Sequence, residues 1–244
     1  MILEVCIDSV ESALAAQEGG AARVELCAAL DHGGTTPSES MIKSVRERVS
    51  IALAVMIRPR PGDFCYSDQE FELMMRDVER VKALGTDGLV FGILTVDGDV
   101  DVPRSRILVE RARPCFVTFH RAFDESRNLE QAINDLKSIG IDRLLSSGGK
   151  GDISKNAVVI AELVRLASGS FKVMAGGGVT FENVSELVRI SRVDEIHVLS
   201  AVSRTRAPDP QIPGLQASPT RVVDVGQVRR MGQLLREASS DSQK

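Results

Sequence analysis

The sequence predicts a single (β/α)8 TIM barrel, on three observations. Strand-like apolar segments alternate with helix-like segments from the first residues to about position 200. Eight such units follow one another, with no change of composition that would mark a second domain. The length of 244 residues also fits, because single α/β barrels commonly have about 250 residues. A doubly wound open sheet is the alternative that the same alternation allows.

Eight short apolar runs, bounded by turn-forming residues, are the predicted strands. They are Leu3–Ile7, Arg23–Cys27, Ala52–Arg58, Gly88–Leu94, Cys115–Arg121, Arg143–Ser147, Lys172–Gly176 and Glu195–Ser200. A helical pattern follows each of them. The predicted helices are Ser9–Glu18, Pro37–Val49, Asp68–Leu84, Pro103–Ala112, Asn128–Ile139, Lys155–Ala167, Phe181–Ile190 and, after the last strand, Val222–Glu237.

Local chemistry supports several of these boundaries. The segment Thr36-Pro37-Ser38-Glu39 offers an N-capping residue and a proline where a helix should begin. Gly85, Gly140 and Gly169 stand where helices should end, because glycine readily adopts the conformation that closes a helix.

We expect one barrel domain over residues 1–238. Four prolines between residues 205 and 221 predict a long irregular loop before the last helix. The polar residues 239–244 are expected to form a flexible tail.

The composition excludes several classes of function. A formal charge of −4 and a pI near 5.5 argue against the basic surface that nucleic-acid-binding proteins need. No apolar run approaches the roughly 20 residues that span a bilayer, and the first residues lack the pattern of a signal peptide. We therefore expect a cytoplasmic protein with neither a nucleic-acid nor a membrane partner. In that compartment its four cysteines should be reduced thiols.

Side chains alternate along a strand, so the apolar set should face the helices and the other set the barrel interior. The residues that this rule assigns to the interior include Glu4, Cys6, Arg23, Glu25, Cys27, Arg58, His120, Glu195 and His197. Buried charges need partners, so we expect Arg58 and Arg23 to pair with the glutamates. A structural ion-pair network that only fills the barrel is the alternative interpretation for Glu4 and Arg23.

The densest motif is the segment from Thr118 to Asp124, where a predicted strand runs into a loop. His120 and Glu25 are candidate general acids or bases, since histidine moves protons near neutral pH. Asp124 is expected to orient the His120 ring or to bind a substrate hydroxyl. Arg58 is a candidate anion clamp, because a guanidinium matches carboxylate or phosphate geometry. Alternatively, His120 and Asp124 only hold the loop.

Three consecutive glycines, Gly176, Gly177 and Gly178, follow the seventh predicted strand and precede a helix. Loops after strands seven and eight of such barrels commonly hold phosphate, and glycines let backbone amides approach an anion. We therefore expect a phosphate or carboxylate site at this loop. A tight turn without a ligand is the alternative.

Cys6 and Cys27 occupy matching positions in two Glu-x-Cys triplets, one on each of the first two predicted strands. Neighbouring strands lie about 4.8 Å apart, so the two sulfurs should be close enough to share a soft cation such as Cu(I). The same proximity permits a disulfide under oxidation. Zinc is less favoured, because no third and fourth ligand stands at a recognisable spacing. Cysteines that act only as small apolar side chains are the alternative.

Six segments together carry a family resemblance: Leu3–Ser9, Arg23–Cys27, Gly33–Ser38, Met56–Arg60, Thr118–Asp124 and Gly176–Gly178. On these segments the chain resembles the CutC family, named for copper homeostasis, over about residues 1–206. The resemblance implies a (β/α)8 barrel, a cytoplasmic homo-oligomer such as a dimer or tetramer, and copper handling. The cysteines proposed as Cu(I) ligands in the family match Cys6 and Cys27 here. It implies no organic cofactor.

Two functions are therefore expected. The first is a copper homeostasis protein that binds Cu(I) through the paired thiols. The second is a TIM-barrel enzyme, a hydrolase or isomerase, that acts on a small phosphorylated or carboxylated metabolite at the C-terminal pole of the strands. Its catalytic residues would be Glu25, Arg58, His120 and Asp124, with the three glycines as the anion loop. An interaction module has little support, because a polar barrel interior is costly to maintain without use.

Overall fold

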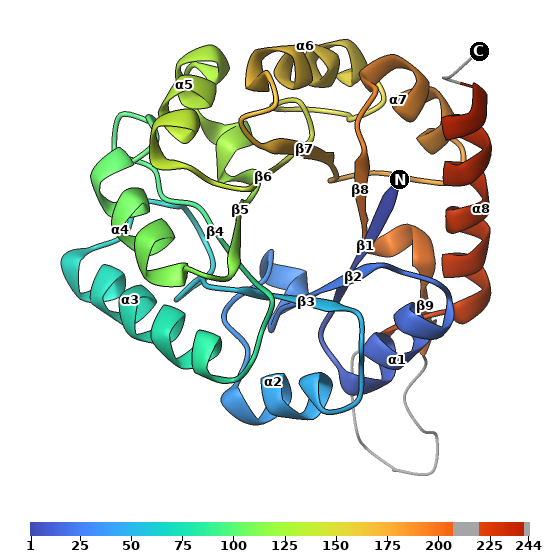
Figure 1. Cartoon of the computed structure of the whole chain (residues 1–244), viewed down its shortest axis with the longest axis horizontal. Helices are drawn as coiled ribbons and strands as arrows, with labels where there is room; N and C mark the ends of the chain where they lie inside the picture. Colours follow the sequence, from blue (N-terminus) through green and yellow to red (C-terminus); the bar gives the residue numbers. More distant parts are fainter. Residues whose placement is uncertain (207–219, 242–244) are drawn as a thin grey trace, which may run out of the picture.

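The computed structural model describes residues 1–206 and 220–241. Eight parallel strands close into a barrel in sequence order, and β8 pairs with β1. They are β1 Ile2–Ile7, β2 Arg23–Leu26, β3 Ala52–Met56, β4 Gly88–Phe91, β5 Phe116–Phe119, β6 Arg143–Ser146, β7 Lys172–Ala175 and β8 Glu195–Val198. Helices surround this barrel (Figure 1). The predicted (β/α)8 barrel is confirmed, and the open sheet is wrong because the first and last strands are hydrogen-bonded.

A helix follows each barrel strand within the described residues. The helices are α1 Val10–Glu18, α2 Glu39–Arg46, α3 Asp68–Ala83, α4 Val102–Ala112, α5 Leu129–Ile139, α6 Ala157–Ala167, α7 Val184–Ser191 and α8 Val225–Asp241. Three short 3-10 helices lie in loops: η1 Leu30–His32, η2 Arg121–Glu125 and η3 Ser200–Val202. Ser38 caps α2 by accepting a hydrogen bond from the Met41 amide, and Gly140 closes α5 at a φ of +73°. The Gly140 end is as predicted, whereas α2 begins at Glu39, two residues after the predicted start at Pro37.

Most strands end one to three residues before their predicted ends. Ile57 and Leu94, which lie beyond two of these ends, stay buried, and the Ile57 amide still donates a hydrogen bond to the Val90 carbonyl of β4 at 2.8 Å. A buried apolar run therefore extends into the loop, and hydrophobicity alone does not locate the last paired residue. Arg58 and His120 consequently lie in loops at the C-terminal pole rather than in strands.

The region before the last helix differs from the prediction. β9 Ser203–Arg206 pairs antiparallel with β10 Thr220–Val223, so both ends of the predicted loop 205–221 are strand, and residues 207–219 lie outside the described residues. Val222 was expected to begin the last helix, but it pairs with Arg204, and Asp224 caps α8 through the Gln227 amide. The predicted tail 239–244 begins as helix, since α8 continues to Asp241. Residues 242–244 lie outside the described residues.

The predicted alternation of side chains is confirmed along the strands. Leu3, Val5 and Ile7 belong to the large apolar cluster between the strands and the helices. A separate small cluster inside the barrel contains Cys6, Cys27, Ala54, Met56 and Val90. No described helix is both long and apolar enough to cross a membrane.

Charged side chains occupy the barrel interior toward the N-terminal ends of the strands. Arg23 of β2 donates hydrogen bonds to Glu4 of β1 and, at 2.5 Å, to Glu195 of β8. Arg143 of β6 donates to the same Glu195 at 2.7 Å. Both Arg23 and Arg143 lie over the ring of Phe116. The expected pairing of Arg23 with glutamates is thus confirmed. Through these bonds Arg23 links β2 to β1 and to β8.

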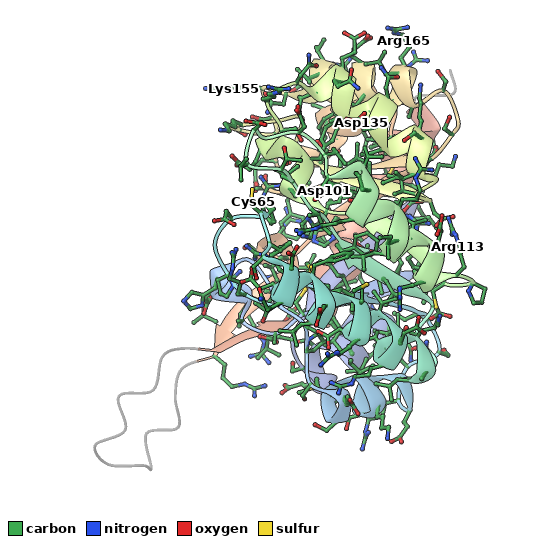
Figure 2. All side chains as sticks on the ribbon, turned by 90° about the vertical axis from the view of Figure 1, so that its left-hand side faces the viewer. Cys65, Asp101, Arg113, Asp135, Lys155 and Arg165 are labelled. Atoms are coloured by element: carbon green, nitrogen blue, oxygen red, sulfur yellow. The ribbon has the colours of Figure 1, made fainter. Side chains whose placement is uncertain are left out.

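Replacing Arg23 with methionine should lower the free energy of unfolding by about 3–5 kcal/mol, the usual cost of leaving buried charges without their partner. Urea denaturation measures this loss. Arg165→Met is the matched control, because Arg165 pairs with Glu162 on the outer surface of α6 (Figure 2). Equal losses of unfolding free energy in the two variants would mean that the interior ion pairs stabilise the barrel no more than an exposed ion pair does.

Candidate functional site

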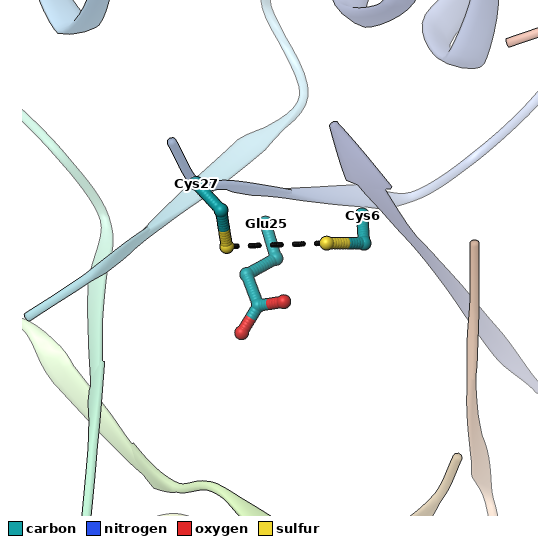
Figure 3. Close-up of side chains that lie close together, drawn as sticks. All are labelled: Cys6, Glu25 and Cys27. Atoms are coloured by element: carbon teal, nitrogen blue, oxygen red, sulfur yellow. Dashed lines mark hydrogen bonds between the residues drawn. The ribbon is translucent and has the colours of Figure 1, made fainter. Parts of the chain in front are cut away.

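The two predicted metal-binding thiols lie together at the C-terminal pole of the barrel. Cys6 is in β1 and Cys27 directly follows β2, where its amide donates to the carbonyl of Ile7. The Sγ atoms are 3.9 Å apart, and both side chains are buried. The Glu25 carboxylate extends between them toward the barrel axis (Figure 3). One carboxylate oxygen and the two sulfurs all lie within 4.8 Å of one another.

Burial keeps both thiols protonated when no cation is present. The hydrogen bond to Cys27, together with burial, raises the pKa of Cys6 well above its usual value. The bond to Cys6 acts in the other direction on Cys27, but burial and the nearby Glu25 charge still raise its pKa to about 11. Neither thiol is therefore a free nucleophile at neutral pH, since the thiolate is the reactive form.

His197 of β8 connects the thiols to the charged barrel interior. Its Nδ1 lies 2.7 Å from Glu4 Oε1, and its Nε2 lies 3.7 Å from Glu25 Oε2. Burial disfavours a charged imidazole, but the Glu25 and Glu4 carboxylates raise the pKa of His197 well above its usual value. Burial likewise opposes ionisation of Glu4, whose pKa is nevertheless lowered to about 2 by Arg23 and His197. The sequence placed His197 in the interior but gave it no role.

A cavity of about 410 Å³ opens above these side chains. Its wall includes Glu25, Arg58 and His120 as well as both thiols, and Gly177 and Gly178 form part of the opposite side. Asp124 and Gly176 are outside the residues that line it. The volume is in the range of pockets that bind small organic molecules. Seven of the predicted site residues therefore line one cavity, namely Cys6, Glu25, Cys27, Arg58, His120, Gly177 and Gly178.

His120 presents a single hydrogen-bond donor to this cavity. The Ala122 amide donates to its Nδ1 at 3.1 Å, so Nε2 carries the ring proton. Nε2 is buried and has no partner among the described residues. Burial and the Arg58 charge lower the pKa of His120 to about 3, which keeps the ring neutral at neutral pH. The expected proton transfer by His120 near neutral pH is therefore disfavoured, and a role as neutral donor is favoured.

Arg58 differs from its prediction. Its guanidinium donates to the carbonyls of Gly33, Gly34 and Gly62 at 3.1, 3.0 and 2.6 Å, and it lies over the ring of Phe64. No glutamate is among the hydrogen-bond or ion-pair partners of Arg58 within residues 1–206 and 220–241. Arg58 lies in a loop after β3, where loop carbonyls are nearer than the interior carboxylates. The expected pairing with a glutamate is wrong, and Arg58 shapes the pocket wall.

Asp124 also has partners other than the expected one. Its carboxylate accepts hydrogen bonds from the hydroxyls of Ser146 and Ser147 at 2.6 and 2.7 Å and from the Gly149 amide at 3.1 Å. Arg121 donates to it at 2.9 Å. These bonds fix the loop after β6 against η2, in agreement with the alternative of a loop clamp. Asp124 therefore positions Arg121 rather than the His120 ring.

Arg121 is a pocket residue that the sequence analysis did not single out. Its side chain is about half exposed, at 48%, and it lies against the glycine loop after β7. A Cβ at Gly177 would stand 2.6 Å from the Arg121 guanidinium carbon, so only glycine permits this approach. The sequence contains a signal for this pocket residue. Arg121 directly follows His120, and a run of glycines allows another side chain to approach the backbone closely.

Comparison with known proteins shows the family and agrees with the fold. The model of the CutC family matches residues 1–202. A family protein CutC of Chromobacterium violaceum is 50% identical over 80% of this chain and 79% of its own length. The copper homeostasis protein cutC homologs of Mus musculus and Homo sapiens are 45% and 44% identical, over 83% of this chain and 75% and 74% of theirs.

Solved structures show the same relationship. A structure described as a copper homeostasis protein CutC from Streptococcus agalactiae has a TM-score of 0.76 at 34% identity, covering 81% of this chain and 97% of that one. Thiamine phosphate pyrophosphorylase from Pyrococcus furiosus has a TM-score of 0.62 at 18% identity over 97% and 96% of the two chains, a likeness of fold alone. From the match over residues 1–202 and these identities, the chain belongs to the CutC family.

Proposed function

We propose that this chain binds Cu(I) through Cys6 and Cys27 as part of copper homeostasis in the cytoplasm. The observation that carries the proposal is the pair of buried sulfurs 3.9 Å apart at the base of the pocket. Thiolates are soft ligands that select Cu(I). The copper homeostasis names of the mammalian relatives support the same role. The cytoplasmic location and the homo-oligomer stay predictions.

Cu(I) binding at this site exchanges protons for a metal ion. Both thiols are protonated in the free protein, because their pKa values are raised. A cation bound to both sulfurs stabilises the thiolates and releases two protons. The Cu(I) ion is then cargo, held out of water by the barrel wall.

Titration of the reduced protein with Cu(I) against a competing chelator tests this proposal. Cys6→Ser and Cys27→Ser should each weaken binding on the order of 100-fold, which is about 2.7 kcal/mol. The affinity of the parent should rise with pH by about a hundredfold per unit, because two protons leave on binding.

Cys65→Ser is the matched control for the titration, since Cys65 lies in the loop between β3 and α3 (Figure 2) and is not among the residues that line the pocket. It should bind Cu(I) like the parent. The copper proposal is wrong if Cys6→Ser and Cys27→Ser also keep the parental affinity.

A second candidate function is an enzyme, a hydrolase or isomerase, that acts on a small phosphorylated or carboxylated metabolite. The observation that favours it is the unpartnered Nε2–H of His120, which a metal cation does not satisfy. A substrate oxygen would accept this hydrogen bond. The cavity of about 410 Å³ also exceeds what one ion needs.

The proposed roles follow from the surroundings of each residue. Burial raises the pKa of Glu25, which brings this carboxylate closer to the range useful for a general base. His120 would donate to a carbonyl oxygen, and Arg121 beside Gly177 and Gly178 would bind the anionic group. Arg58 would shape the cavity wall beside these groups, and Asp124 and Gly176 would support them from outside the cavity.

2-Phosphoglycolate, which carries both a phosphate and a carboxylate, is a probe for this second function. Its titration, followed by NMR of the histidine ring nitrogens, should shift the His120 signal as Nε2 gains a partner. Arg121→Ala should weaken binding about tenfold or more, since a hydrogen bond to a charged group contributes about 1.5–3 kcal/mol.

Arg127→Ala is the control for the probe titration, because Arg127 pairs with Asp99 outside the pocket. It should bind 2-phosphoglycolate like the parent. An unchanged His120 signal at saturating probe would count against this function.

A further inference from the structure

The separation of the two thiols favours a cation with more than two ligands. Cys6 Sγ and Cys27 Sγ lie 3.9 Å apart. Two metal–sulfur bonds of about 2.3 Å that span this distance enclose an angle of about 116°, near the tetrahedral angle of about 109°. Bonds of that length in a straight line would need sulfurs about 4.6 Å apart. The pair is therefore spaced as one edge of a tetrahedron.

Glu25 offers a third donor atom on the same side. Its carboxylate points from β2 into the space beside both sulfurs (Figure 3), and one oxygen lies within 4.8 Å of each. Glu25 Oε1 is buried and has no hydrogen-bond partner within the described part of the chain. A buried acceptor without a donor costs about 1–3 kcal/mol. The unpaired oxygen therefore indicates a positively charged ligand at this point.

His197 offers a fourth donor atom. Its Nε2 lies 3.7 Å from Glu25 Oε2, and His197, Glu25 and Glu4 form a second group whose potential ligand atoms lie within 4.8 Å of one another. Its Nδ1 is held 2.7 Å from Glu4 Oε1. Metal-binding histidines almost always donate their other ring N–H to a carboxylate or carbonyl, which fixes the ring with one nitrogen toward the metal. Arg23 in turn fixes Glu4, so the His197 ring has the support that a ligand needs.

The charge of these groups suits a divalent ion better than a monovalent one. Two thiolates and the Glu25 carboxylate bring three negative charges into a buried site once the bound metal has replaced the two thiol protons and the Nε2 proton of His197, while Glu4 and Arg23 offset each other. Uncompensated charge in a low-dielectric interior is costly. Two positive charges therefore leave a smaller imbalance than one. Cysteine, histidine and carboxylate are also the usual ligands of Zn²⁺.

We propose that Cys6, Cys27, Glu25 and His197 form a four-ligand tetrahedral site for a divalent cation, represented by Zn²⁺. The site shares its thiols with the proposed Cu(I) site but does not depend on copper binding. Cu(I) binding needs the two sulfurs alone, whereas Zn²⁺ binding needs all four side chains. The third and fourth ligands that sequence spacing did not reveal come from β2 and β8.

The first test is titration of the reduced, full-length protein with zinc chloride in competition with a metal indicator. It should show one Zn²⁺ bound per chain. X-ray absorption of the zinc-loaded protein should then find two sulfur and two nitrogen or oxygen scatterers around the metal. This count is made on the parent protein, so it holds even if a variant fails to fold.

Variants separate the four-ligand site from a site made of the thiols alone. Glu25→Gln, which keeps the side-chain volume, and His197→Gln should each weaken Zn²⁺ binding by at least tenfold while Cu(I) affinity changes little. Glu4→Gln should weaken it about 10–100-fold, the usual effect of losing the group that orients a ligand. His32→Gln is the histidine control, because His32 is exposed in η1, and it should bind like the parent.

The four-ligand site is overturned if no Zn²⁺ binds, or if X-ray absorption finds fewer than two sulfurs. It is also overturned if folded Glu25→Gln and His197→Gln both bind Zn²⁺ as tightly as the parent. Cu(I) binding without Zn²⁺ binding would refute this inference and leave the copper proposal intact. Zn²⁺ binding without Cu(I) binding would support this inference and refute the copper proposal.

Discussion

The site depends on the ion pairs that the buried guanidinium of Arg23 forms with Glu4 and Glu195. The guanidinium offsets the charges of Glu4 and Glu195 and so allows carboxylates inside the barrel. Because Arg23 and His197 hold the pKa of Glu4 at about 2, Glu4 remains an acceptor for the His197 ring at any ordinary pH. The ring then faces Glu25 and the thiols. A contact near the N-terminal ends of the strands thus sets the geometry at the C-terminal pole.

The pocket divides into two chemically different sides. The side made by β1, β2 and β8 carries electron-pair donors, namely two sulfurs and the Glu25 carboxylate. The side after β5 and β7 carries hydrogen-bond donors, His120 Nε2 and the Arg121 guanidinium beside the glycine loop. A cation would pair with the first side and leave His120 Nε2 without an acceptor, whereas an organic anion would accept from His120 and Arg121 and leave the first side without a cation. The two proposed ligands are therefore complementary within one cavity.

Strand alternation made the interior residues predictable, because a period of two places every second side chain inward. It located Glu4, Cys6, Glu25 and His197 correctly, and family resemblance added the role of the thiols. Strand alternation does not predict the contacts of residues beyond the strand ends. Arg58 binds loop carbonyls, and Asp124 binds the loop after β6, because loop partners depend on contacts between segments distant in sequence. No local pattern specifies those contacts.

The same limit explains why zinc was disfavoured from the sequence. His197 faces the thiols only because the barrel closes and β8 pairs with β1, with Glu4 opposite His197. Among the described residues, closure also leaves Glu25 Oε1 buried without a hydrogen-bond donor, which costs free energy. A cation that pairs with this oxygen binds the folded state alone, so its binding energy adds to the stability of the barrel. The barrel closure that brings His197 opposite Glu4 therefore also creates the buried acceptor through which a bound cation would stabilise the fold.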